Sequence, residues 1–145
     1  MIPVQIQIKS VIYHEGEGEP EVIQQQAEGQ LDVREDEWVL RYRENTGTED
    51  ETRTTVKSWP DYLMVIRHGA VSYRQTYRPH QTITSMVHTP AGQTEMDVTT
   101  LDYIREWKPP NGRISFSFHL TMGQEKMGRY QLTIQWIEGK ENERT

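Results

Sequence analysis

Apolar and polar residues alternate with a period of two along most of the chain. The segment from Arg113 to Leu120 is the clearest case, because its apolar side chains fall on even positions and its polar side chains on odd positions. A run from Tyr130 to Trp136 repeats the pattern. Successive side chains of a strand point to opposite faces, so each run predicts a strand with one buried and one wet face.

Turn residues interrupt this alternation at short intervals. Pro109–Gly112 is the strongest hairpin signal, and Glu15–Pro20 and Asn45–Asp50 are turns by composition. Tyr103–Trp107 either continues the preceding strand past a bend or starts another. We predict an all-β fold, a single closed antiparallel up-and-down barrel of about 8–11 strands, because closure removes exposed sheet edges. Residues 1–140 form this one domain and residues 141–145 a polar tail.

The parity of the apolar residues also predicts the barrel core. Gly29 lies on the inner face of its strand, which indicates a bend or the close approach of another segment. The predicted core positions are Ile6, Ile8, Leu40, Val56, Ile66, Phe116, Phe118, Leu132 and Ile134.

Composition narrows the function classes. Only 34% of the 145 residues are hydrophobic and the mean hydropathy is -0.83, as one wet face per strand requires. The chain has no cysteine, which excludes disulfides, thiolate metal sites and cysteine nucleophiles. The first residues lack a signal-peptide pattern and no stretch approaches the ~18 apolar residues of a membrane span, so we expect a cytoplasmic protein that meets no membrane.

Charge is distributed unevenly along the chain. Residues 1–51 hold 13 acidic and 4 basic residues, and residues 52–145 hold 9 acidic and 12 basic residues. We expect a basic surface patch of Arg53, Lys57, Arg74 and Arg78. It could meet an anionic ligand or the acidic end of a second copy in a homodimer. Alternatively, these cations only protect strand edges from unwanted pairing.

Catalytic, metal and nucleic-acid chemistry find little support. The five histidines are widely spaced and form no metal-ligand pair, so we expect neither a metal nor a cofactor. Glu95 and Asp97 face water by parity, and no nucleophile motif occurs, so a catalytic role is less expected than binding. Neighbouring Tyr and Arg residues point to opposite faces of a strand. This arrangement and a net charge of -6 argue against nucleic acid as a partner.

One strand segment carries charge on its aromatic face. Tyr103, Arg105 and Trp107 share a parity, so an inward Arg105 would be a cation flanked by rings that could hold the head group of an apolar acid. Alternatively, the strand end is exposed and Arg105 lies over Trp107 in water. His88 is a further candidate, as a hydrogen-bonded interior histidine.

Several segments together resemble the YwiB-like family of small bacterial β-barrel proteins. They are Lys9-Ser10, Glu51–Lys57, Arg67–Val71, Thr89–Gly92 and Gly112–Phe116, which follow one another through nearly the whole chain. The resemblance implies a lipocalin-like (calycin-type) barrel in a cytoplasmic bacterial protein, and it supplies no catalytic residues. The Gly-x-Trp of true lipocalins is missing, since the first tryptophan is Trp38 after Asp36 and Glu37.

These observations predict a non-catalytic barrel that binds a small, partly apolar and anionic molecule. The alternative is a module that binds a protein or RNA through its outer surface. An interior cavity of roughly 300 Å³ or more would favour the first, and an interior filled by side chains the second.

Overall fold

The computed structural model describes residues 1–16 and 18–139 as ten strands without a helix. The predicted tail 141–145 lies outside the described residues, as does residue 140. Within them no helix is long and apolar enough to cross a membrane. The strands are β1 (Ile2–His14), β2 (Glu21–Arg34), β3 (Glu37–Glu44), β4 (Thr52–Ser58), β5 (Leu63–His68), β6 (Tyr73–Tyr77), β7 (Thr82–Thr89), β8 (Gly92–Lys108), β9 (Asn111–Met122) and β10 (Glu125–Glu138).

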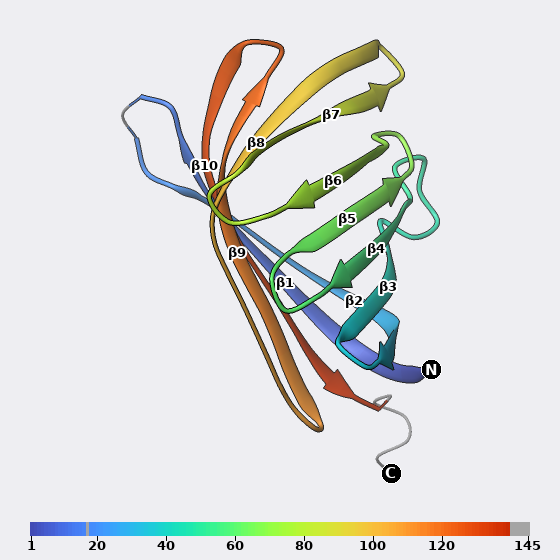
Figure 1. The fold of residues 1–145 in the computed structure, drawn as a ribbon. Coiled ribbons are helices and arrows are strands. Elements are labelled where there is room, and N and C mark those ends of the chain that lie inside the picture. Colours follow the sequence, from blue (N-terminus) through green and yellow to red (C-terminus); the bar gives the residue numbers. More distant parts are fainter. Residues whose placement is uncertain (17, 140–145) are drawn as a thin grey trace.

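The strands form one antiparallel sheet that curls into a nearly closed barrel (Figure 1). Their order in the sheet is β6-β5-β4-β3-β2-β1-β10-β9-β8-β7, so each strand lies beside its neighbour in sequence and β1 pairs with β10. The all-β, up-and-down prediction is confirmed.

β6 and β7 are the two edge strands of the sheet, and we call the line along which they meet the seam. Few backbone pairs join the two strands there. The seam contains the single bridge Ser72↔His88. The buried side chain of Gln75 also spans it, donating to the carbonyl oxygen of Ile83 at 3.0 Å and accepting from the Ser85 hydroxyl. A side-chain amide thus takes the place of missing backbone pairs.

A bulge in β8 explains why this long strand changes faces. Its register with β9 shifts between Thr100 and Asp102. Before the bulge the inward residues are even-numbered, as Met96 and Val98 are, and after it they are odd-numbered. Tyr103–Trp107 therefore continues the strand, one of the two alternatives that the sequence left open.

The core follows the predicted parity in most strands. Of the predicted positions, Ile6, Ile8, Leu40, Val56, Phe116, Phe118 and Ile134 are buried, and Leu132 is partly buried against them. Ile66 is wrong. Leu63 and Val65 point inward, so Ile66 lies on the outer face of β5 and is only partly buried.

Gly29 marks a close approach, as predicted. A Cβ there would lie 2.3 Å from the Arg41 carbonyl oxygen and 2.8 Å from Ile6 Cδ1. Pairing of β2 with β3 begins at this residue, with Gly29↔Tyr42. The residues of β2 that precede it have no pair in β3.

Candidate functional site

Three tryptophans pack together at the end of the barrel that holds the β2–β3 and β8–β9 turns. The ring centroid of Trp38 lies 5.9 Å from that of Trp107 and 6.0 Å from that of Trp136, both edge to face. Trp136 fits only because β9 carries a glycine opposite it: a Cβ on Gly112 would lie 2.0 Å from the Trp136 ring. Trp107 donates its Nε1 proton to Glu138 at 2.9 Å.

Arg105 points into this end but is satisfied by the chain itself. Its guanidinium lies over the Trp38 ring, 4.0 Å from the centroid. Nη1 donates to the carbonyl oxygen of Ser58 at 3.0 Å. The stacking partner is therefore Trp38 rather than Trp107. Whether Arg105 also binds a ligand remains a prediction.

Tyr103 ties β8 to the turn after β4. Its hydroxyl donates to the Trp59 carbonyl oxygen at 2.6 Å and contacts the Ser58 hydroxyl. Burial raises the pKa of Tyr103 above its ordinary value, although Ser58 and Arg105 act in the opposite sense. Tyr103 and Arg105 thus bridge the barrel where no ladder pairs β8 with the described residues of β4.

His88 does not belong to this group. β7 buries Val87 and carries Ile83 and Ser85 on the same face, so His88 lies exposed on the outer face with Met86. Its expected place in the interior is wrong. The alternation in β7 is weak, and the apolar Met86 lies on its outer face. The face that His88 shares with Met86 was therefore predicted to be the inner one.

An inward ion pair was missed by the sequence reasoning. Nη2 of Arg67 lies 3.2 Å from both carboxylate oxygens of Glu44, whose side chain is 10% exposed, and the Thr54 hydroxyl donates to the same carboxylate at 2.9 Å. Burial lowers the pKa of Arg67, but Tyr73 and Glu44 outweigh it and the pKa is raised. The alternation along the strands could have revealed this pair. Glu44 lies two positions after the buried Tyr42, and Arg67 lies two positions after the buried Val65, so each shares the inner face of its strand.

Aromatic side chains fill the barrel between these two polar groups. Tyr77 packs against Phe116 and Phe118 with centroid distances of 4.8 and 5.0 Å, and Phe118 stacks on Tyr130 at 5.4 Å. Burial raises the pKa of Tyr77 well above its ordinary value. Together with the aliphatic side chains, these rings form one core cluster inside the barrel.

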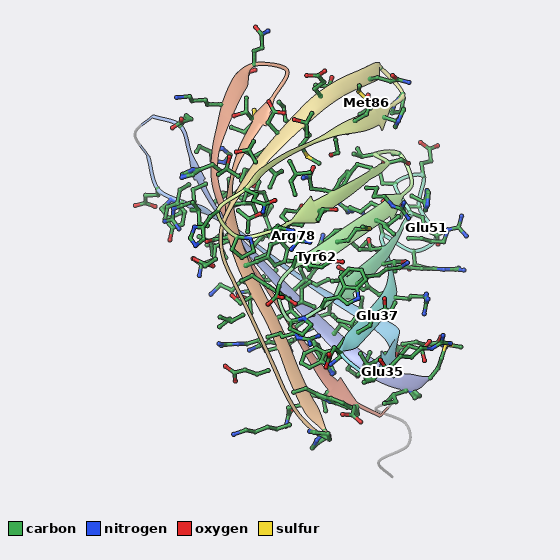
Figure 2. The ribbon with its side chains drawn as sticks, in the orientation of Figure 1. Glu35, Glu37, Glu51, Tyr62, Arg78 and Met86 are labelled. Atoms are coloured by element: carbon green, nitrogen blue, oxygen red, sulfur yellow. The ribbon has the colours of Figure 1, made fainter. Side chains whose placement is uncertain are left out.

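The four residues of the predicted basic patch lie on the outer side, but not as neighbours. Arg53 and Arg74 are exposed, and β5 lies between their strands. The register sets Lys57 opposite Met64 and Arg74 opposite Ile66. The Arg78 guanidinium lies 4.1 Å from the ring centroid of Tyr62 (Figure 2). The ring of Tyr62 itself stacks on that of Trp59.

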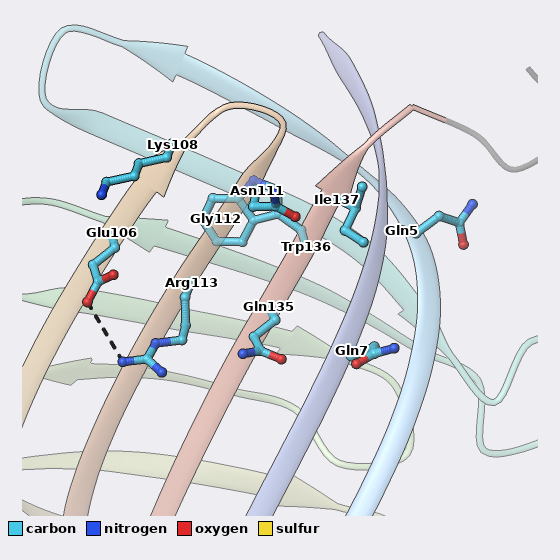
Figure 3. A pocket seen from close by; sticks show the side chains of 10 residues that line it. All are labelled: Gln5, Gln7, Glu106, Lys108, Asn111, Gly112, Arg113, Gln135, Trp136 and Ile137. Carbon is cyan, nitrogen blue, oxygen red and sulfur yellow. Dashed lines mark ion pairs between the residues drawn. The ribbon is translucent and has the colours of Figure 1, made fainter. Parts of the chain in front are cut away.

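One hollow lies on the outer wall across β1, β10, β9 and β8 (Figure 3). We call it the wall groove. Its volume is about 490 Å³. Arg113 and Glu106 form an ion pair of 3.8 Å along it, and Gln5, Gln7, Lys108 and Gln135 also line it.

A second hollow lies over β1 to β4, where β2 and β3 part. We call it the arginine trough, and its volume is about 960 Å³. Gln26, Glu28, Arg41, Arg43, Arg53 and Thr55 line it. Arg41 is paired with Asp32 at 3.4 Å. Within residues 1–16 and 18–139, neither Arg43 nor Arg53 has a carboxylate within ion-pair distance.

A family model described as "Domain of unknown function (DUF1934)" matches residues 6–134. The chain belongs to this family. It is 26% identical over 137 residues to the "Uncharacterized beta-barrel protein YwiB" of Bacillus subtilis (strain 168), covering 94% of each chain. The crystal structure of the ywiB protein from Bacillus subtilis has the same fold, with a TM-score of 0.82, 24% identity and coverage of 96% of this chain and 93% of that one. The resemblance to YwiB-like proteins is thereby confirmed.

Proposed function

We propose that this family member is a non-catalytic interaction module, a barrel filled by its own side chains whose outer wall binds a partner protein. The observation that carries the proposal is the filled interior. Trp136, Phe116, Leu40 and Leu63 are each less than 2% exposed and belong to one core cluster, joined by the aromatic residues that span the barrel. A barrel packed in this way offers its wall, not its inside, for binding.

The polar groups inside the barrel support the same proposal. Arg105 is bound to a carbonyl oxygen and a ring of its own chain, and Arg67 to a carboxylate. A ligand head group would have to displace these partners. The hollows of the wall, in contrast, are lined by glutamines and arginines that are exposed or partly exposed to solvent.

The experiment is photo-crosslinking inside the organism that makes the protein. A photoreactive amino acid replaces Gln26 in the arginine trough or Gln135 in the wall groove, and Met86 on the distant β7 serves as the matched exposed control. We expect a discrete protein adduct from a hollow and none from Met86. Absence of adducts from both hollows, with a small molecule retained in native mass spectrometry, would contradict the proposal.

A second candidate function is binding of a small, partly apolar anion. The volume of the wall groove, about 490 Å³, lies in the range of ligand pockets. The groove combines Ile137 and Trp136 with the cations Lys108 and Arg113. Arg105 is the other cation that could hold such a head group.

Tryptophan fluorescence distinguishes the two cations. Fatty and aromatic acids are titrated into the wild type, Arg113→Ala and Arg105→Ala. A response lost only in Arg113→Ala supports the wall groove, and one lost only in Arg105→Ala supports the barrel end. Equal responses in all three proteins, or none, would reject small-anion binding at both sites.

An RNA partner is disfavoured by the spacing of the outer cations and the net charge of -6. We expect a labelled single strand to pass through a column of the immobilised protein at low ionic strength. Retention that weakens steeply with salt would favour RNA over a protein partner.

A further inference from the structure

One half of β2 has a neighbour on one side only. β1 pairs with β2 from Ile2↔Leu31 to Ile12↔Glu21, whereas β3 pairs with it only from Gly29↔Tyr42 to Arg34↔Glu37. Within the described part of the chain, no strand pairs with the other side of Glu21–Glu28. An unpaired edge of this length can accept another strand.

The direction of the backbone groups at this edge follows from one hydrogen bond. The Gly139 amide donates to the Pro3 carbonyl oxygen at 2.7 Å, so the backbone of Pro3 faces β10. Backbone groups of a strand alternate in direction, so the even-numbered residues of β1 face β2. Their partners there are odd-numbered, as in Ile6↔Ala27 and Ile8↔Gln25.

The even-numbered residues of β2 therefore direct their N–H and C=O groups away from β1. These residues are Val22, Gln24, Gln26 and Glu28, and all four side chains are exposed. Unpaired backbone groups in a row form a template for an incoming strand. Val22, with 52% of its surface exposed, adds an apolar contact at the far end.

The charges beside this edge indicate what the incoming strand carries. Arg43 and Arg53 lie directly opposite each other on β3 and β4, and His68 follows Arg53 in the next strand. Like charges opposite each other are unfavourable in a sheet. Glu28 and Glu51 line the same hollows as the pair, yet among the described residues neither lies within ion-pair distance of it. An acidic side chain at the end of the new strand nearest β3 would complement both arginines.

We propose that an extended acidic segment of a partner protein adds to the edge Glu21–Glu28, with its carboxylates against Arg43 and Arg53 in the arginine trough. This inference rests on the proposed function and names the chemistry of the partner.

The test uses the whole protein and a fluorescent eight-residue peptide in which glutamate alternates with valine and threonine. A matched peptide carries lysine in place of glutamate. Anisotropy at low salt is expected to show the acidic peptide binding at least about tenfold more tightly than the lysine peptide. Equal affinities for the two peptides would overturn the proposal.

Two kinds of variant separate the backbone edge from the arginines. Gln24→Pro and Gln26→Pro each remove one N–H at the open side and keep the ladder with β1, so each is expected to weaken binding by about tenfold. Gln24→Ala keeps the N–H and serves as the control. Arg43→Gln with Arg53→Gln should flatten the salt dependence. Unchanged binding in both proline variants, shown to be folded by urea unfolding, would overturn the strand addition.

Sedimentation of the protein alone provides the remaining outcome. A dimer that Gln24→Pro abolishes would show that the edge binds a second copy, and the inference would fail. If the acidic peptide does not bind while Gln26 still crosslinks to a protein in the host, the interaction module stands and only the acidic strand is rejected.

Discussion

The interior of the barrel and the arginine trough differ in whether their arginines have partners within the chain. Inside, Arg67 has the Glu44 carboxylate and Arg105 has the Ser58 carbonyl oxygen and the Trp38 ring. In the trough, Arg43 and Arg53 face each other, and the adjoining edge of β2 leaves backbone groups unpaired among the described residues. Burial makes an unpaired polar group costly, so most buried groups have a partner within the chain, although Arg67 Nε, Thr100 Oγ1 and Trp136 Nε1 have none in the part of the chain that the structure describes. An exposed group can instead be left to a partner protein.

The largest effect is expected in the apolar part of the interior. Phe116 is fully buried between the rings of Tyr77 and Phe118, so Phe116→Ala should lower the free energy of unfolding by about 3–5 kcal/mol. Urea unfolding measures it. Its neighbour Ser115 faces outward, and Ser115→Ala is the control. A loss below about 1 kcal/mol for Phe116→Ala would mean that this part of the interior is not tightly packed.

Removal of a charged partner inside the barrel should have the next largest effect. Glu44→Ala leaves the guanidinium of Arg67 without its carboxylate and should cost about 2–3 kcal/mol. Adding Arg67→Met to Glu44→Ala should recover part of this loss, because the unpaired charge is then gone. Urea unfolding of both single variants and the double variant measures the coupling. Additive losses would show that the two side chains do not interact.

The buried tyrosines predict how stability depends on pH. Burial raises the pKa of Tyr42 and of Tyr77 above the ordinary value of 10.0. The folded protein keeps these protons when the unfolded chain releases them, so their stabilisation is complete below about pH 10 and is lost as the pH rises toward the folded values.

Unfolding in urea between about pH 8 and 11 should therefore show a plateau and then a decline. Each such tyrosine contributes up to about 1.4 kcal/mol per pH unit to the slope. Tyr77→Phe should make the decline shallower, while Phe118→Leu, which removes no hydroxyl, should keep the wild-type slope. An unchanged slope in Tyr77→Phe would mean that this hydroxyl reaches water.

The smallest effect is expected in the trough, with the opposite sign. Arg53→Thr removes one of two like charges that face each other, so it should raise the free energy of unfolding by about 0.2–1 kcal/mol at low salt. The gain should shrink as salt is added. Arg74→Thr, whose neighbour on β5 is Ile66, is the matched control. Destabilisation by Arg53→Thr would contradict the inference that Arg53 and Arg43 repel each other in the trough.

How much the sequence could predict depended on the strand. In β9 every second residue is apolar, and the inward face was predicted correctly. In β5 the run Leu63, Met64, Val65 and Ile66 is apolar throughout, so parity alone could not tell the faces apart. Pairing with β4, which sets Val56 beside Val65, decides the inner face and turns Arg67 inward.

The candidate binding surface depends on features that single strands do not encode. Arg43 and Arg53 become neighbours only through the register of β3 with β4. The open edge of β2 exists because β3 leaves β2 at Gly29, a residue whose close contact with Arg41 and Ile6 was predicted only as a bend or a close approach. At the barrel end, the shared face of Tyr103, Arg105 and Trp107 was predictable from parity. The contact of Arg105 with Trp38, some seventy positions away in the chain, was not.

The weak seam between β6 and β7 makes the chain suited to circular permutation. The first and last strands of the chain already lie side by side, since β1 pairs with β10 and the Gly139 amide donates to the Pro3 carbonyl oxygen. A permutant that links these ends and opens at Arg78–Gln81 would keep every ladder, break only the covalent connection across the seam, and run in sequence from β7 through β10 and β1 to β6. The pairing of β1 with β10, which joins the two strands farthest apart in the natural sequence, would become local. Proteins with lower contact order fold faster, so the permutant should fold faster than the natural order of strands.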